Sequence, residues 1–240
     1  MNVPINIYAE NMDNLKKLVQ INKSLKQEKL VIFTWGNASY RCKKENVVYI
    51  KPSGVPFEEL QPQQISKVDL ATGNHIGGFK PSVDTPTHLV LYEAFPEINA
   101  IIHTHSKYCT IFAQAKVNIP CLGTTHADYF YGDIPVVGNL SKKEIHEDYE
   151  KNTGLKIVEY FKEKNISPLE IQASLSPSHG VFVWGENLDD ALKNAIILEN
   201  IAEMAYKTMK LCYNGLVDFD KSLLDKHFLR KHGNQKYYGQ

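Results

Sequence analysis

The sequence predicts one α/β domain over residues 1–240, with a central mixed, largely antiparallel sheet between two layers of helices. Segments with helical periodicity alternate with short β-branched and aromatic runs, a pattern typical of helices packed against a sheet. Several of the strand-like runs are joined by short polar turns, which indicates hairpins and antiparallel pairing. A chain of 240 residues with 43% hydrophobic residues can bury one sizeable core.

The first 80 residues predict a helix and two hairpins. Apolar residues recur at helical spacing among lysines over residues 9–28. Residues 30–50 carry many β-branched and aromatic side chains around a polar turn, and so predict two strands. Residues 66–79 predict a second hairpin, with Gly73 and Asn74 at its tip.

The next segments alternate between helix and buried strand. Thr85 before Pro86 predicts a helix start, and Pro96 ends that helix. The run 99–106 is short, apolar and bounded by polar residues, as expected of a buried strand. A helix follows over residues 106–116.

The C-terminal half predicts three helices and a hairpin. Residues 142–165 are typical of a long polar helix, with a break expected near residues 153–154. Residues 171–185 predict a hairpin, and 187–210 predict a helix with an asparagine cap and two acidic residues in its first turn. A last helix is expected over residues 221–231.

Charge and cysteine content argue against several classes of function. The 27 basic and 27 acidic residues balance, and no basic block indicates a nucleic-acid-binding surface. The four cysteines lie far apart without a C-x-x-C pair, which argues against a zinc ribbon or a redox motif. No apolar stretch approaches the roughly 20 residues of a membrane span, and no signal peptide is recognisable. We therefore expect a cytoplasmic protein without nucleic-acid or membrane partners.

Two histidines separated by one residue end the buried strand predicted over 99–106. In a strand, residues i and i+2 face the same side, so His103 and His105 are expected to point together. Neutral imidazole is a favoured ligand of zinc and similar divalent metals. The alternative is that both histidines are merely hydrogen-bonded at a strand end.

Two further residues are candidate ligands. His179 lies in a Ser-His-Gly turn of the predicted 171–185 hairpin, just before an apolar strand. Asp84 is the candidate carboxylate, although it could equally cap the helix that follows. Thr85 can take that capping role, which would leave the Asp84 carboxylate available.

Seven segments resemble the class II aldolase/epimerase family, and they follow the family order from Thr34 to Gln240. The resemblance therefore covers nearly the whole chain, and the fifth and seventh segments are typical of the epimerase branch. The segments are TWGNAS, KPSG, PSVDTPTH, IIHTHS, GTTHADYFYGDIP, SHGVFVWG and DKHFLRKHGNQKYYGQ.

The resemblance implies a metal centre and a phosphate site. The metal would be Zn²⁺, or another divalent cation such as Mn²⁺ or Co²⁺, held by His103, His105 and His179 with Asp84 as a ligand or close neighbour. Backbone N–H groups, hydroxyls and a lysine also suit a phosphate dianion, although a Lys-Pro-Ser-Gly turn alone is equally a surface loop. The implied phosphate-binding residues are Asn37, Lys51, Ser53, Gly54 and Ser82.

The resemblance also implies an acid/base pair, Asp128 and Tyr238. By itself Asp128 could be a loop carboxylate that accepts backbone hydrogen bonds, and Tyr238 lies near the C-terminus, where side chains are often idle. The resemblance places this tail over the active site of a neighbouring subunit, together with His227 and Arg230. It therefore implies a homo-oligomer, with a fourfold ring as the family pattern.

The implied activity is a metal-dependent 4-epimerase that interconverts L-ribulose 5-phosphate and D-xylulose 5-phosphate by cleaving and re-forming the C3–C4 bond. No glycine-rich dinucleotide fingerprint supports a redox route. The alternatives are a class II sugar-phosphate aldolase and a non-catalytic interaction domain on the same scaffold. Val83 departs from the family, because related epimerases usually carry a second serine there.

Overall fold

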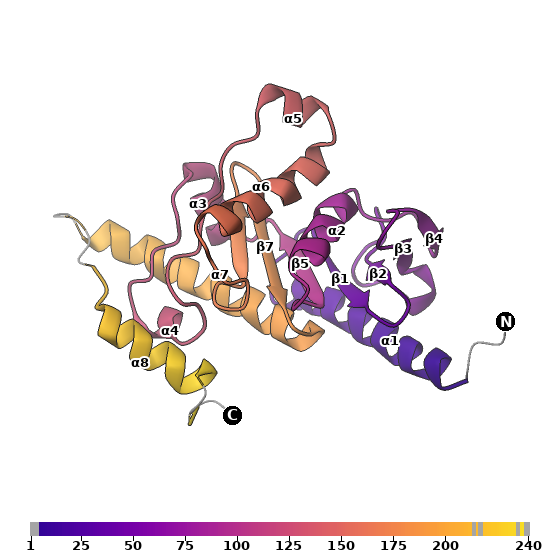
Figure 1. Ribbon diagram of the computed structural model, residues 1–240, viewed down its shortest axis with the longest axis horizontal. Coiled ribbons are helices and arrows are strands. Elements are labelled where there is room, and N and C mark those ends of the chain that lie inside the picture. Colours follow the sequence, from indigo (N-terminus) through magenta and orange to yellow (C-terminus); the bar gives the residue numbers. More distant parts are fainter. Residues whose placement is uncertain (1–4, 213–214, 216–217, 234–235, 238–240) are drawn as a thin grey trace.

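The computed structural model describes residues 5–212, 215, 218–233 and 236–237. In this part of the chain, seven strands form one sheet in the order β4-β3-β2-β1-β5-β7-β6 (Figure 1). The strands are β1 (Asn37–Cys42), β2 (Val47–Ile50), β3 (Ser66–Asp69), β4 (His75–Gly77), β5 (Ala100–Thr104), β6 (Ala173–Ser176) and β7 (Gly180–Gly185).

Every pairing between these strands is antiparallel. The largely antiparallel sheet is therefore confirmed, and the parallel component expected of a mixed sheet is reduced to one bridge, Val136 to Leu175, between a loop and β6. The hairpins expected over 66–79 and 171–185 correspond to β3–β4 and β6–β7. In these hairpins short turns impose the antiparallel pairing, because a parallel pair needs a long crossover.

Helices cover both faces of the sheet, as predicted (Figure 1). On one face α7 contacts β5 and β7 and packs against α1 and α3, and on the other α2 packs against α6. The helices are α1 (Ile5–Gln27), α2 (Thr85–Ala94), α3 (Lys107–Ala115), α4 (Thr124–Ala127), α5 (Lys142–His146), α6 (Tyr149–Glu163), α7 (Leu188–Leu211) and α8 (Lys221–His232), with a 3-10 turn η1 (Pro62–Gln64).

The long polar helix breaks earlier than expected. It ends as α5 and resumes as α6, and Asp148 between them adopts the left-handed conformation with φ +53°. Gly154 lies inside α6, where an added Cβ would stand 2.9 Å from Cβ of Val90 and 3.0 Å from the carbonyl oxygen of Thr87. The expected break at 153–154 is therefore wrong, because this glycine permits close packing of α2 against α6.

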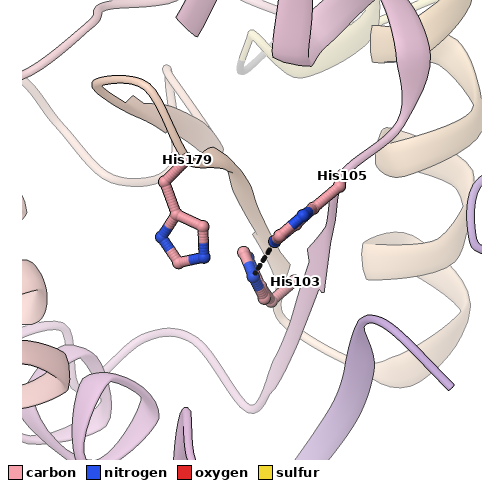
Figure 2. Close-up of side chains that lie close together, drawn as sticks. All are labelled: His103, His105 and His179. Carbon is pink, nitrogen blue, oxygen red and sulfur yellow. Dashed lines mark hydrogen bonds between the residues drawn. The ribbon is translucent and has the colours of Figure 1, made fainter. Parts of the chain in front are cut away.

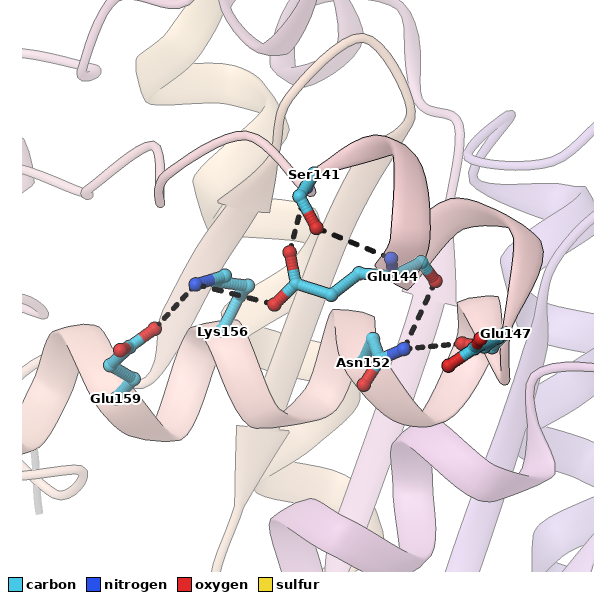
Figure 3. Close-up of polar contacts among 6 residues, drawn as sticks. All are labelled: Ser141, Glu144, Glu147, Asn152, Lys156 and Glu159. Carbon is cyan, nitrogen blue, oxygen red and sulfur yellow. Dashed lines mark hydrogen bonds and ion pairs between the residues drawn. The ribbon is translucent and has the colours of Figure 1, made fainter.

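Polar side chains hold the α5–α6 corner together (Figure 3). Ser141 caps α5 by accepting from the Glu144 backbone N–H at 3.3 Å, and the Glu144 carboxylate accepts from the Ser141 N–H at 2.7 Å. Lys156 of α6 pairs with the same carboxylate at 3.5 Å. The Asn152 amide donates to the carbonyl oxygens of Glu144 and Glu147. The Ser141–Glu144 pair thus caps the start of α5, and the Asn152 bonds satisfy two carbonyl oxygens that the break would otherwise expose.

The segment 30–36 forms turns where a strand was expected. Phe33 has φ +52° and Gly36 has φ +92°, conformations that do not fit an extended strand. An added Cβ on Gly36 would lie 2.7 Å from the carbonyl oxygen of His103, so this loop runs directly against the end of β5. None of the helices in the described residues is long and apolar enough to cross a bilayer.

Candidate metal and phosphate site

Three histidines converge at one end of the sheet (Figure 2). His103 is in β5, His105 follows one residue beyond its end, and His179 lies in the turn between β6 and β7. One nitrogen from each ring can be chosen so that all three lie within 4.8 Å of one another. The expectation that distant parts of the chain bring three imidazoles together is therefore met in the geometry.

The donor atoms fit a small divalent cation. His103 Nδ1 lies 3.0 Å from the Val181 carbonyl oxygen, which can only accept, so Nδ1 carries the proton and Nε2 keeps its lone pair. The Nε2 atoms of His103 and His105 are 3.2 Å apart. Two imidazole nitrogens that bind one tetrahedral zinc at its usual distance are about 3.3 Å apart. This spacing suits a shared cation.

Close packing fixes the rings in this arrangement. His103 stacks on its cross-strand partner Phe182 with 4.2 Å between ring centroids. At Gly180, an added Cβ would stand 2.6 Å from the Thr104 carbonyl oxygen and 3.0 Å from the His105 ring. The glycine after His179 is therefore required because the two histidine-bearing segments approach each other so closely.

Burial keeps the imidazoles neutral. It lowers the pKa of the buried His103 to about 3. Partial desolvation by neighbouring groups also lowers the pKa values of the half-buried His179 and of His105, although His105 keeps an exposed side. Burial alone would raise the pKa of Asp84, but His103, His88 and the Asn37 amide outweigh it, and the pKa is lowered overall. At neutral pH the site therefore offers uncharged imidazole ligands beside an ionised carboxylate, the protonation states that metal binding requires.

Asp84 lies beside the histidines but outside the close group of three ligand atoms. It occupies the N-cap position of α2, where Thr85 was expected, yet its side chain makes no capping bond. Its carboxylate accepts instead from Asn37 Nδ2 at 2.8 Å and from Ser82 Oγ at 3.2 Å. The expectation that Thr85 caps the helix is wrong, because Thr85 lies inside α2 and its Oγ1 donates to the Ser82 carbonyl oxygen at 2.6 Å.

The predicted phosphate-binding residues lie around the same place. Asn37 pairs with His103 in the β1–β5 register and donates to Ser82 Oγ at 3.0 Å. A bridge between Pro52 and Pro81 joins the Lys-Pro-Ser-Gly turn to the segment that leads to Ser82.

Within that turn, the residues differ in exposure. Ser53 and Gly54 are exposed, and Gly54 has φ +72°. Lys51 is buried, with Nζ 4.5 Å from the centre of the Phe57 ring, and burial lowers its pKa to about 8. Lys51 therefore remains mostly charged at neutral pH. Val83 is 60% exposed at the surface beside Ser82.

Asp128 belongs to a second cluster. It ends α4, and its carboxylate accepts from His227 Nδ1 at 3.0 Å and from the Arg230 guanidinium at 3.0 and 3.1 Å. His232 Nε2 lies 3.0 Å from the Asp128 carbonyl oxygen. The alternative that Asp128 bonds backbone N–H groups is therefore wrong for its carboxylate, which is bound by side chains. Tyr238 lies outside the described residues.

The two clusters occupy different parts of the chain. Helices α4 and α8 pack together at the end of the molecule opposite the β1–β4 strands (Figure 1). In the residues that the structure describes, no hydrogen bond, ion pair or ring contact of His103, His105 or His179 reaches Asp128 or His227.

One neighbour of the histidines was not foreseen from the sequence. Tyr149, the first residue of α6, places its hydroxyl 3.4 Å from His179 Nδ1. Burial raises the pKa of this phenol, which therefore keeps its proton at neutral pH and can donate to the ring. Tyr149 begins α6 directly after the unexpected break, and it is 30 residues from His179 in the sequence, so local patterns did not point to it.

Comparisons with known proteins agree with this architecture. The family model of the class II aldolase and adducin N-terminal domain matches residues 16–206. The chain is 43% identical over 230 residues to L-ribulose-5-phosphate 4-epimerase UlaF of Salmonella paratyphi C (strain RKS4594). The aligned residues cover 95% of this chain and 100% of that protein. The protein of the same name from Salmonella choleraesuis (strain SC-B67) matches equally well.

Two solved structures show the same fold. An L-fuculose 1-phosphate aldolase superposes with a TM-score of 0.74 at 23% identity, over 90% of this chain and 94% of that one. The L-fuculose 1-phosphate aldolase from Glaciozyma antarctica PI12 gives a TM-score of 0.75 at 18% identity, over 98% and 88%. With the family match over most of the sequence, these likenesses establish that the chain belongs to the class II aldolase and adducin N-terminal domain family.

Proposed function

We propose that this protein is an L-ribulose-5-phosphate 4-epimerase that uses a divalent metal. The observation that carries the proposal is the convergence of His103, His105 and His179 beside Asp84, Asn37 and Ser82, in a chain 43% identical to an enzyme of that name. A non-catalytic role is disfavoured because a domain used only for interaction has no need of three neutral imidazoles at metal-binding spacing.

The chemistry of the substrate explains why such a site is useful. In a 2-ketopentulose 5-phosphate, the C4 proton has no neighbouring carbonyl to stabilise a carbanion, so simple proton exchange at C4 is difficult. Breaking the C3–C4 bond is easier, because its electron pair enters an enediolate over C2 and C3 while the C4 hydroxyl loses its proton. Rotation of the glycolaldehyde phosphate and re-addition through its other face then inverts C4.

The three histidines would hold the cation, with Zn²⁺, Mn²⁺ and Co²⁺ all suited to imidazole ligands. When bound, such a cation supplies Lewis-acid stabilisation of the negative charge on the C2 and C3 oxygens. Asn37 and Ser82 hold the Asp84 carboxylate next to the imidazoles. The negative charge of this carboxylate would favour the binding of a cation by the imidazoles.

The phosphate would bind where the Lys-Pro-Ser-Gly turn meets Ser82. The exposed Ser53 and Gly54 offer a hydroxyl and backbone N–H groups, and Lys51 adds positive charge. Anchoring the phosphate keeps the cleaved aldehyde fragment in the site while it rotates. This retention distinguishes an epimerase from an aldolase, which releases the fragment.

Asp128 and Tyr238 are the proposed acid/base pair, one for each face of the aldehyde. Proton transfer to and from the C4 oxygen must occur on both faces, so two groups are needed. His227 and Arg230 hold the Asp128 carboxylate through four hydrogen bonds. Among the described residues, no hydrogen bond, ion pair or ring contact joins this cluster to the histidines of its own chain. We therefore propose that a neighbouring subunit supplies it, in a ring of four subunits.

The metal requirement is tested by assaying conversion of L-ribulose 5-phosphate to D-xylulose 5-phosphate before and after chelation. We expect chelated protein to lose roughly 10³-fold in kcat/KM, and Zn²⁺, Mn²⁺ or Co²⁺ to restore it. Turnover that survives complete metal removal contradicts the proposal. Glycolaldehyde phosphate as the main product would instead identify an aldolase.

The shared active site is tested by mixing two inactive variants, His103→Ala and Asp128→Asn. If each site combines histidines of one subunit with Asp128 of another, random co-assembly restores about a quarter of the wild-type activity. The control is the double variant that carries both substitutions. Taken alone through the same procedure, it must stay inactive. A mixture as inactive as its components would mean that both clusters of a site come from one chain.

A further inference from the structure

Helix α3 begins two residues after His105 and lacks its usual cap. Ser106 occupies the N-cap position but its side chain makes no capping bond. The first backbone N–H groups of a helix have no partner within the helix, and an unsatisfied end would leave this segment loosely held. The position of the His105 backbone therefore depends on what satisfies the start of α3.

Glu199 of α7, far along the chain, accepts hydrogen bonds from two of these N–H groups. Its Oε1 accepts from the Tyr108 N–H at 2.8 Å and its Oε2 accepts from the Cys109 N–H at 3.1 Å. Helices α3 and α7 pack against each other, so the carboxylate ties the start of α3 to a long, regular helix. Negative charge at a helix N-terminus is also favourable to the helix dipole.

His105 depends on this tie more than the other two histidines do. His103 is paired on both sides within the sheet and donates to the Val181 carbonyl oxygen. His179 lies in a tight turn next to Tyr149. His105 is exposed and lies beyond the end of β5, and its hydrogen bond within the described residues is to His103, another candidate ligand.

We propose that Glu199 is a positioning residue that sets the place of His105 through the start of α3. This inference rests on the metal centre of the proposed function but not on the substrate or the reaction. A carboxylate on two successive N–H groups fixes the direction in which the chain leaves His105, and thereby the approach of its imidazole to the other two rings. The side chain itself does not touch metal or substrate.

The test measures Zn²⁺ dissociation constants of whole protein by chelator competition, for wild type, Glu199→Gln and Glu199→Ala. Loss of outer partners of a metal site typically weakens affinity 10–100-fold. We expect such a loss for Glu199→Ala and a smaller one for Glu199→Gln, whose amide oxygen can still accept one bond. Unchanged affinity in both variants would overturn the proposal, even if they were less stable.

Asp220→Ala is the matched control, because it removes the side-chain cap of α8, which lies in the Asp128 cluster and not beside the histidines. It should lower Tm to a similar degree, since a lost cap costs about 1 kcal/mol, while Zn²⁺ affinity stays unchanged. An equal loss of affinity in this control would show a general effect of instability and would also overturn the proposal. Wild-type protein that binds Zn²⁺ but does not epimerise would contradict only the proposed function.

Discussion

The histidine cluster and the Asp128 cluster are built in different ways. The histidines are placed by the sheet, through strand register, the stacking of His103 on Phe182 and the glycine that follows His179. Asp128 is placed by the side chains of one terminal helix, α8. The first cluster offers neutral donors for a cation, and the second is a carboxylate held by positive or hydrogen-bonding groups. The proposed reaction needs both a bound cation and an acid/base group. This is why a neighbouring subunit is proposed to bring the two clusters together.

The largest expected effects separate the two clusters by function. His103→Asn should remove metal binding and lower kcat/KM about 10³-fold or more. Asp128→Asn should lower kcat about 10²–10⁴-fold, the usual contribution of a general acid or base, with bound metal unchanged. Metal analysis and steady-state kinetics on the same preparations distinguish them. Loss of metal from Asp128→Asn would show that the clusters are not separate.

A smaller effect is expected where the backbone of the histidine site is closely packed. Gly180→Ala places a Cβ 2.6 Å from the Thr104 carbonyl oxygen, so the β6–β7 turn must shift away from β5. We expect Zn²⁺ affinity to fall about 10-fold and stability by about 1–3 kcal/mol, as for overpacked sites. Gly138→Ala, with open space around its Cβ, is the control and should change neither quantity.

The smallest expected effect is a dependence of stability on pH. It comes from His126 in α4, the helix that Asp128 ends. His126 of α4 is buried and lies 2.8 Å from the Gly132 carbonyl oxygen, and burial lowers its pKa from 6.5 to about 4. Between these two values the unfolded chain binds a proton that the folded chain does not, so stability falls as the pH falls. From pH 7 to pH 5.5 this histidine should contribute a loss of about 1 kcal/mol.

His126→Gln keeps a donor for Gly132 but cannot titrate. The variant should show a weaker dependence of the free energy of unfolding on pH over this range, as measured by denaturant titration. Because His126 is not in the histidine cluster, bound Zn²⁺ should be the same in both proteins. An unchanged pH dependence would mean that another group, such as the buried His88, dominates it.

Much of the fold follows from local patterns. The hairpins at 66–79 and 171–185, the helix over 187–210 and the buried strand before His103 were all predictable, because their periodicity and turn residues act over a few neighbours. The break in the 142–165 helix was predicted at the wrong place. Gly154 is needed for close packing against Val90 of another helix, and it does not end the helix. The prediction of a strand from residue 30 was wrong for a similar reason, because Gly36 packs against the His103 carbonyl oxygen on a distant strand.

Residue type and short spacing single out His103 and His105, and the resemblance to the family adds His179, Asp84 and the Lys-Pro-Ser-Gly turn. Long-range packing accounts for the rest: Asp84 is bound by Asn37 and Ser82, Glu199 secures the start of α3, and Asp128 is held by His227 and Arg230 apart from the histidines. These contacts join residues that are tens of positions apart. They depend on how the sheet and helices pack, and no local pattern in the sequence encodes that packing.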